Sequence, residues 1–321
     1  MPYYPERKPD PYAEEQKRIE EAAARSRRRR LALAALFALV ILYSLIRLIA
    51  YGADYMSSRQ ASQELQELYE EPTQIVTAAP TAAPKAQPAT AEPRQETPTP
   101  SPEPEQEAVL PPAAYPDTPN LVVSERFRKL RKKNKNIIGW VKVDAVEEPV
   151  GLKDNTYFLT HDINGKKNAN GAIFTDSGIN LYTRPYTIFL FGHNMKSGNM
   201  FGRLRKYKES AYCYRHRIIT FDSMYEEGTY AVFAVAEIST ETGDSNYFDL
   251  WSLDSAKVEE RQNALNKLLS RSIHTRMLDV HPDEQLLILV TCEGKDADRL
   301  VVAARRLREG ESENNLTLPP L

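Results

Sequence analysis

Three residues whose side chains can do chemistry together lie at the ends of apolar runs in the second half of the chain. Cys292 ends the run Leu286–Thr291, and His193 follows Thr187–Gly192. Arg299 comes seven positions after Cys292 and opens another apolar run. A thiolate is a strong nucleophile, an imidazole of pKa about 6.5 can move its proton, and a guanidinium can stabilise a thiolate or an oxyanion. Together the three side chains could attack an amide carbonyl.

Each of these residues also has an ordinary structural interpretation. A free cysteine is often buried in a core, a histidine often caps a turn, and Arg299 could pair on the surface with Asp296 or Asp298. The second cysteine, Cys213, follows no apolar run, so we interpret it as a structural residue or a spare thiol.

The elements that must position these residues are mostly strands. Alternating or continuous apolar runs bounded by turn residues predict strands at 137–143, 172–175, 187–192, 217–221, 229–238, 285–291 and 300–306. Helices are expected at 124–134 and, from one apolar face, at 253–272. The fold class is therefore mostly β, and a closed or nearly closed β-barrel with peripheral helices fits best.

The N-terminal part predicts a membrane anchor. Residues 31–50 form an apolar run of the length that crosses a bilayer, and an arginine cluster at 25–30 precedes it. The positive-inside rule then places 1–30 in the cytoplasm as a basic tail and the rest of the chain outside the cell. The alternative is a cleaved signal peptide, but the run is longer than a signal peptide needs.

Residues 51–119 are expected to form a linker. The segment is rich in Pro, Ala, Thr and Glu, a composition that favours a disordered, semi-stiff stalk, although 56–71 could form a short polar helix. The chain from 120 to 321 is long enough for one domain, which we take as the catalytic domain.

Composition excludes several classes of protein. A formal net charge of -2 gives no reason to expect a nucleic-acid partner, and two cysteines are too few for a disulfide scaffold or a cysteine-rich zinc site. We expect no metal and no cofactor.

Several motifs, taken in their order, resemble the class B sortases of Gram-positive bacteria. The resemblance covers about 120–308 and rests on Asn136–Val143, Pro149-Val150, Asp154–Leu159, Gly171–Asp176, Gly192–Met195, Met200-Phe201, Leu204, Leu289–Cys292 and Arg299. It implies a sortase-type β-barrel with Cys292 as nucleophile, His193 as acid and base, and Arg299 as the residue that binds substrate and stabilises the oxyanion. Asn155, Thr291 and Glu293 are weaker candidates for lining the substrate groove.

The resemblance also implies an activity and its partners. Such an enzyme is a single-pass protein of the cell membrane with an extracellular catalytic domain. It cleaves a C-terminal sorting motif of a secreted protein and passes the acyl group to an amine of peptidoglycan precursor or of a pilin. Two alternatives belong to other classes: a cysteine peptidase, in which water resolves the thioacyl intermediate, and a surface binding module without enzymatic activity.

Overall fold

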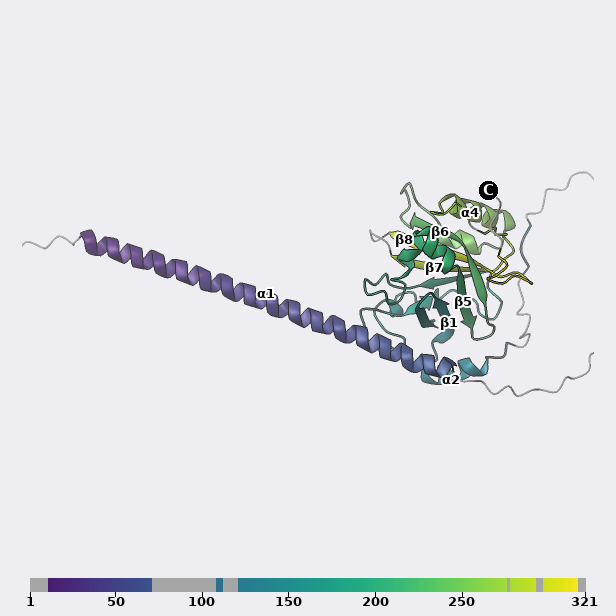
Figure 1. Ribbon diagram of the computed structural model, residues 1–321, viewed down its shortest axis with the longest axis horizontal. Helices are drawn as coiled ribbons and strands as arrows, with labels where there is room; N and C mark the ends of the chain where they lie inside the picture. The colour runs from purple at the N-terminus through teal and green to yellow at the C-terminus, as the bar shows by residue number, and fades with distance from the viewer. Residues whose placement is uncertain (1–10, 71–107, 112–120, 276–277, 293–296, 317–321) are drawn as a thin grey trace, which may run out of the picture. The chain divides into compact units, whose positions relative to one another are not determined.

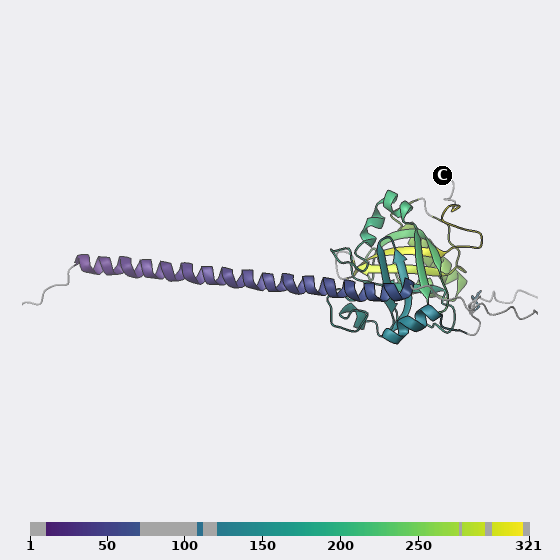
Figure 2. The ribbon, with the colours of Figure 1, turned by 60° about the horizontal axis from the view of Figure 1, so that its bottom comes forward.

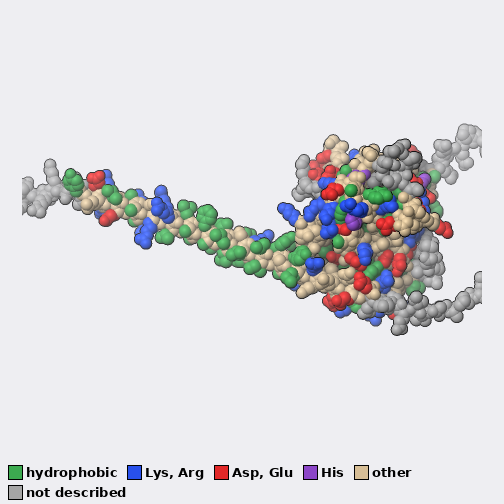
Figure 3. Space-filling model, in the orientation of Figure 1, with side chains coloured by type: hydrophobic (Ala, Val, Ile, Leu, Met, Phe, Trp, Pro, Cys, Tyr) green, Lys and Arg blue, Asp and Glu red, His purple; other side chains and the backbone are tan. Residues whose placement is uncertain are grey.

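The computed structural model describes residues 11–70, 108–111, 121–275, 278–292 and 297–316, and of Cys292 it describes the backbone alone. The chain divides into two compact units, Met1–Met56 and Ser57–Leu321. Helix α1 (Pro11–Glu70) runs through the first unit and into the second. Among the described residues, α1 is the helix long and apolar enough to cross a membrane. Figure 3 shows a band of hydrophobic side chains along it, beside a group of basic ones.

The second unit is built on a closed eight-stranded barrel with the strand order β1-β2-β3-β4-β7-β8-β6-β5 (Figures 1 and 2). Its strands are β1 (Ile137–Val143), β2 (Val146–Gly151), β3 (Ile173–Thr175), β4 (Thr187–Phe191), β5 (Ile218–Ser223), β6 (Thr229–Ser239), β7 (Leu286–Cys292) and β8 (Asp298–Arg306). The pairs β2–β3 and β4–β7 are parallel, and the other pairs are antiparallel. This topology confirms the expected barrel.

Short helices cover the barrel. They are α2 (Glu125–Lys133), η1 (Tyr157–Leu159), η2 (Leu204–Lys208), α3 (Ser210–Arg215), η3 (Leu250–Asp254) and α4 (Val258–Ser270). The Ser124 side chain accepts a hydrogen bond from the Phe127 amide and so caps the start of α2. Both helices expected from the sequence are therefore present, with shorter bounds for α4.

Strand β7 separates two hydrophobic cores because its side chains alternate between two faces. Leu287 and Leu289 belong to the core that fills the barrel. Leu286, Ile288 and Val290 belong to a second core, which they share with α4. Since both faces of β7 are covered, the strand reads as a continuous apolar run in the sequence.

The one strand that the sequence did not predict is β2. Its central residues Glu147, Glu148 and Pro149 look like a turn, because two carboxylates and a proline are unfavourable in most strands. In the barrel this segment pairs with β1, and Pro149 lies opposite Trp140. Pairing with β1 on one side and with β3 on the other therefore overrides the local preference.

The end of α1 corrects the expected linker. Residues 51–70, which we assigned to the linker with a possible short helix at 56–71, are helical throughout, and residues 57–70 belong to the same unit as the barrel. Leu65 is 2% exposed within the barrel core, and the ring of Tyr69 stacks on Trp140 with centroids 4.4 Å apart. The linker residues 71–107 and 112–119 lie outside the described residues. The compact unit thus begins near Ser57 rather than at 120.

We predict that Leu65→Ala lowers the free energy of unfolding by roughly 2–4 kcal/mol, because a buried leucine loses its contacts and leaves a cavity. Urea unfolding of the full-length chain in detergent measures the change. Glu67, which is exposed on the same helix, provides the control, since Glu67→Ala should change the stability little. Equal stabilities of the two variants would show that the helix does not pack on the barrel.

Glu148 predicts a pH dependence of stability. Burial raises the pKa of its carboxyl from 4.5 to about 7, the hydroxyl of Ser62 on α1 opposes the rise by donating a hydrogen bond, and the charge of Glu147 adds to it. The folded state therefore keeps the proton to higher pH than the unfolded chain does. As the pH rises from 4.5 through about 7, we expect the free energy of unfolding to fall by on the order of 2 kcal/mol.

The test compares wild type with Glu148→Gln over that pH interval. Glutamine cannot ionise and still accepts the hydrogen bond of Ser62, so the difference between the two proteins should grow with pH, with the variant more stable near neutrality. A difference that stays constant from acidic to neutral pH would contradict the assigned burial of this carboxyl.

Candidate active site

A groove crosses four strands of the barrel and brings together several of the residues singled out from the sequence. Its cavity has a volume of about 270 Å³. It is lined by Asn155, Leu159, Phe174, Asp176, Phe191, Gly192, His193, Trp251, Val290, Thr291 and Arg299. The lining combines apolar and aromatic side chains with a few polar ones, as in sites that bind small organic ligands.

Strand register places Cys292 at this groove. Phe191 on β4 and Val290 on β7 are partners in a parallel pair, and both line the groove. His193 and Cys292 each lie two residues further along these neighbouring segments. Because residues two apart in a strand share a face, position 292 lies on the face of β7 that Val290 presents to the groove.

The same register brings Arg299 to Cys292. In the antiparallel pair of β7 and β8, Cys292 lies directly opposite Arg299. Opposite positions in such a pair share a face of the sheet. Arg299 lines the groove, and its Nη1 donates a hydrogen bond to the carbonyl oxygen of Asp298 at 2.9 Å. Positions 292 and 299 are therefore neighbours on adjacent strands.

The imidazole of His193 is held by the main chain. Its Nε2 lies 2.8 Å from the carbonyl oxygen of Leu159 in η1. The main chain after it turns back, because the Phe201 amide donates to the His193 carbonyl oxygen at 3.0 Å and Asn194 forms a bridge with Met200. The histidine therefore follows β4 in an ordered turn at the groove.

The weaker sequence candidates have different positions. Asn155 lines the groove, and its side chain donates to Asp176 at 2.6 Å and accepts from the Ser177 amide at 2.7 Å, so it ties the loop before η1 to β3. Thr291 also lines the groove, and its buried hydroxyl oxygen has no hydrogen-bond partner within the described ranges. Glu293 lies outside the described residues.

Trp251 is a groove residue that the sequence analysis missed. It is 52% exposed, and its ring packs edge-on against Phe189 with centroids 4.9 Å apart. It lies on η3, in the segment between β6 and α4. Trp251 stands among other apolar residues, such as Phe248 and Leu250, so the sequence does not distinguish it as a groove residue, and only the folded chain brings η3 beside β4.

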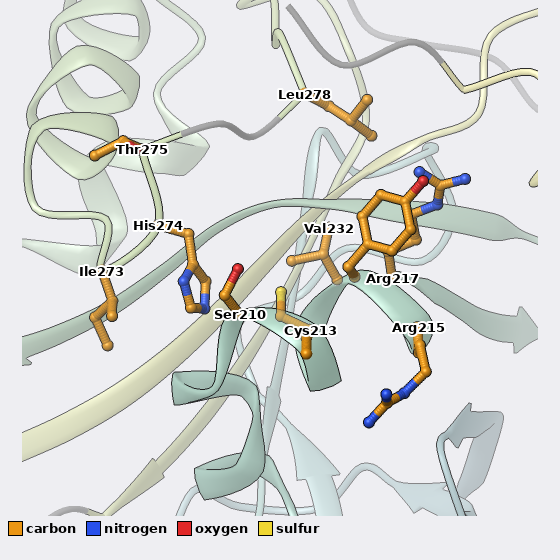
Figure 4. Close-up of a pocket in the computed structure, with 11 residues that line it drawn as sticks. Ser210, Cys213, Arg215, Arg217, Val232, Ile273, His274, Thr275 and Leu278 are labelled. Atoms are coloured by element: carbon orange, nitrogen blue, oxygen red, sulfur yellow. The ribbon is translucent and has the colours of Figure 1, made fainter.

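Cys213 lies away from the groove, as expected of a structural cysteine. It is buried on α3, and burial raises the pKa of its thiol to about 11. Figure 4 shows that it lies at a separate cavity, of about 820 Å³, with His274 nearby. The Nε2 of His274 lies 2.6 Å from the carbonyl oxygen of Tyr207. This cavity shares no lining residue with the groove.

No metal centre is found in the described part of the chain. Among those residues, no group of three or more His, Cys, Asp or Glu side chains is placed to hold a metal ion.

Comparison with known proteins decides the family. A family model described as the sortase domain matches residues 141–307. The chain belongs to the sortase family. It is 30% identical over 175 residues to sortase B of Listeria monocytogenes, an alignment that covers 53% of this chain and 68% of that protein. It is 28% identical over 192 residues to sortase B of Staphylococcus aureus, covering 58% and 76%.

Solved structures agree with this assignment. Sortase B from Bacillus anthracis in complex with AAEK1 superposes with a TM-score of 0.57 at 23% identity, covering 80% of this chain and 99% of that one, and shows the shared fold. The Staphylococcus aureus sortase B–substrate complex has a TM-score of 0.51 at 25% identity, covering 58% and 86%. The chain is a class B sortase, and a sortase is a cysteine transpeptidase.

Proposed function

We propose that this sortase cleaves a C-terminal sorting motif of secreted proteins and transfers the acyl group to an amine of peptidoglycan precursor or of a pilin. The observation that carries this proposal is the strand register, which places the positions of Cys292 and Arg299 opposite each other at a groove that His193 also lines. The Staphylococcus aureus sortase B bound to a substrate supports a peptide substrate here.

The proposed reaction has two steps. In the first, His193 accepts the thiol proton of Cys292, and the thiolate attacks the carbonyl carbon of a threonine in the motif. The C–N bond breaks, His193 returns the proton to the leaving amine, and a thioacyl-enzyme remains. In the second step the accepting amine attacks the thioester, loses a proton to His193, and releases the thiolate of Cys292.

Arg299 is proposed to stabilise negative charge in both steps. The carbonyl oxygen of the motif becomes an oxyanion when sulfur or nitrogen attacks, and a guanidinium beside it stabilises that charge. Arginine suits this role because it stays protonated at any relevant pH.

We further propose that the enzyme is anchored in the cell membrane by α1. The apolar residues 31–50 would cross the bilayer, the basic tail 1–30 would stay in the cytoplasm, and the barrel would lie outside the cell. The exposed hydrophobic side chains from Leu31 to Ile49 support this role, since such a surface is unfavourable in water.

The test is intact-mass analysis of the full-length protein in detergent, mixed with a library of peptides that carry candidate sorting motifs. A mass increase equal to the acyl fragment, discharged to an amide when an amine is added, supports transpeptidation. Discharge to the free acid despite added amine would favour a cysteine peptidase. The absence of an adduct with every peptide would contradict the proposed substrate class.

A further inference from the structure

The imidazole of His193 lies against a residue that has no side chain. Gly171 has a φ of +63°, a conformation that side chains disfavour. A Cβ at this position would lie 2.3 Å from the carbonyl oxygen of Phe158 and 3.0 Å from Cδ2 of His193. The first distance is far below van der Waals contact, so any side chain at 171 would displace η1, the imidazole, or both.

The carbonyl that holds the imidazole is itself fixed by the main chain around Gly171. The Phe158 carbonyl, one residue before that of Leu159, accepts a hydrogen bond from the Ala172 amide at 2.9 Å. The Thr160 carbonyl, one residue after it, accepts from the Asn168 amide at 2.9 Å. The Leu159 carbonyl therefore lies between two anchored neighbours and has little freedom to follow a displaced ring.

The hydrogen bond to Leu159 decides which ring nitrogen can exchange protons. A carbonyl oxygen can only accept, so Nε2 of His193 must carry a hydrogen. In the neutral imidazole this leaves Nδ1 as the unprotonated nitrogen, and thus as the base. In other cysteine and serine enzymes a carboxylate or amide side chain fixes the tautomer of the histidine; here a main-chain carbonyl occupies that place.

We propose that Gly171 is a positioning residue for His193, which lets the ring lie close enough to the Leu159 carbonyl for Nε2 to stay protonated and Nδ1 to act as the base. The inference rests on the proposed role of His193 in proton transfer. It adds a residue that touches neither substrate nor nucleophile and yet determines which atom of the histidine moves the proton.

The experiment compares Gly171→Ala with a matched glycine of the same region. Gly165 also has a positive φ, of +84°, and a Cβ there would meet only the Tyr157 hydroxyl, at 3.0 Å. Gly165→Ala therefore imposes the same kind of backbone strain without contact with His193. Both variants are made in the full-length chain in detergent, and their thermal unfolding is measured first.

Two readouts separate positioning from general damage. The first is the rate at which iodoacetamide alkylates Cys292, which needs no peptide substrate. Cys213→Ala serves as the common background so that a single thiol remains. The second is the ¹⁵N spectrum of the labelled histidines, in which His193→Gln identifies the signals of His193 and the shifts report the tautomer.

The expected result is specific to position 171. Wild type and Gly165→Ala show the Nε2-protonated tautomer and similar alkylation rates. Gly171→Ala shows a mixed or Nδ1-protonated tautomer, and its alkylation is slower by about 100-fold, the loss that a misplaced catalytic group can cause. In a His193→Ala background, Gly171→Ala should slow alkylation no further.

Several outcomes would overturn the inference. An Nδ1-protonated tautomer in the wild type would do so without any variant, even where Gly171→Ala fails to fold. An unchanged tautomer in a folded Gly171→Ala protein would reduce Gly171 to a structural role. Because neither readout uses a sorting peptide, failure to find a substrate would count against the proposed function and not against this positioning role.

Discussion

Cys292→Ala should abolish both the acyl adduct and the transfer product, with a loss of activity of roughly 10⁴-fold or more, because no described residue that lines the groove carries another thiol. The position of Cys292 opposite Arg299 is the structural reason for this expectation. Intact-mass analysis of the full-length variant with an active peptide measures the adduct, and chromatography of the peptide products measures the residual turnover.

The matched control is Cys213→Ala. This thiol is buried at a different cavity, and its raised pKa of about 11 keeps it protonated near neutral pH. The control should therefore form the adduct at the wild-type rate, provided that its stability is close to that of wild type. If Cys213→Ala lost the adduct and Cys292→Ala retained it, Cys213 and not Cys292 would be the nucleophile.

Arg299→Ala should slow formation of the thioacyl-enzyme by about 10²–10³-fold, the effect of removing one group that stabilises an oxyanion. Arg299→Lys should recover only part of this loss, because lysine keeps the charge but not the planar fork of donors. Single-turnover acylation followed by mass spectrometry measures the rate constant for each variant.

Arg306 provides the control on the same strand. It lies at the far end of β8, where its Nη1 donates to Gln285 and its Nη2 pairs with Glu226. Arg306→Ala removes an arginine and weakens packing at that end, so thermal unfolding should change while the acylation rate per folded molecule stays the same. If Arg299→Ala acylates as fast as Arg306→Ala, the guanidinium at the groove has no part in the reaction.

The sequence predicted the bounds of several strands to within a residue. Ile137–Val143 has the predicted bounds, β4 is one residue shorter than predicted, and β7 is shifted by one residue, because apolar runs between turn residues leave few alternatives. For the end of α1 the sequence allowed a short polar helix at 56–71, but its polar composition led us to assign it to the linker and not to the barrel unit. The partner that makes the helix stable there, Trp140, lies about seventy positions away in the chain.

For the site, the sequence predicted positions better than contacts. Strand ends predicted that positions 193, 292 and 299 come together; the register pairs 292 with 299, His193 and Arg299 line one groove, and the catalytic roles stay predictions. The roles of the Leu159 carbonyl and of Gly171 could not be predicted, because every residue carries a main-chain carbonyl and the sequence does not mark which one will accept a hydrogen bond. Only the folded chain brings them to the imidazole.

The docked end of α1 limits how far from the bilayer this enzyme can work. With 31–50 in the membrane, as proposed, only residues 51–56 separate the lipid from the first residue of the barrel unit. Six residues span at most roughly 20 Å when fully extended. The proline-rich segment lies beyond this tether, and it joins Glu70 to Ala108, two residues of one compact unit. It therefore does not lengthen the tether, and with the proposed anchor the barrel unit must begin within roughly 20 Å of the lipid.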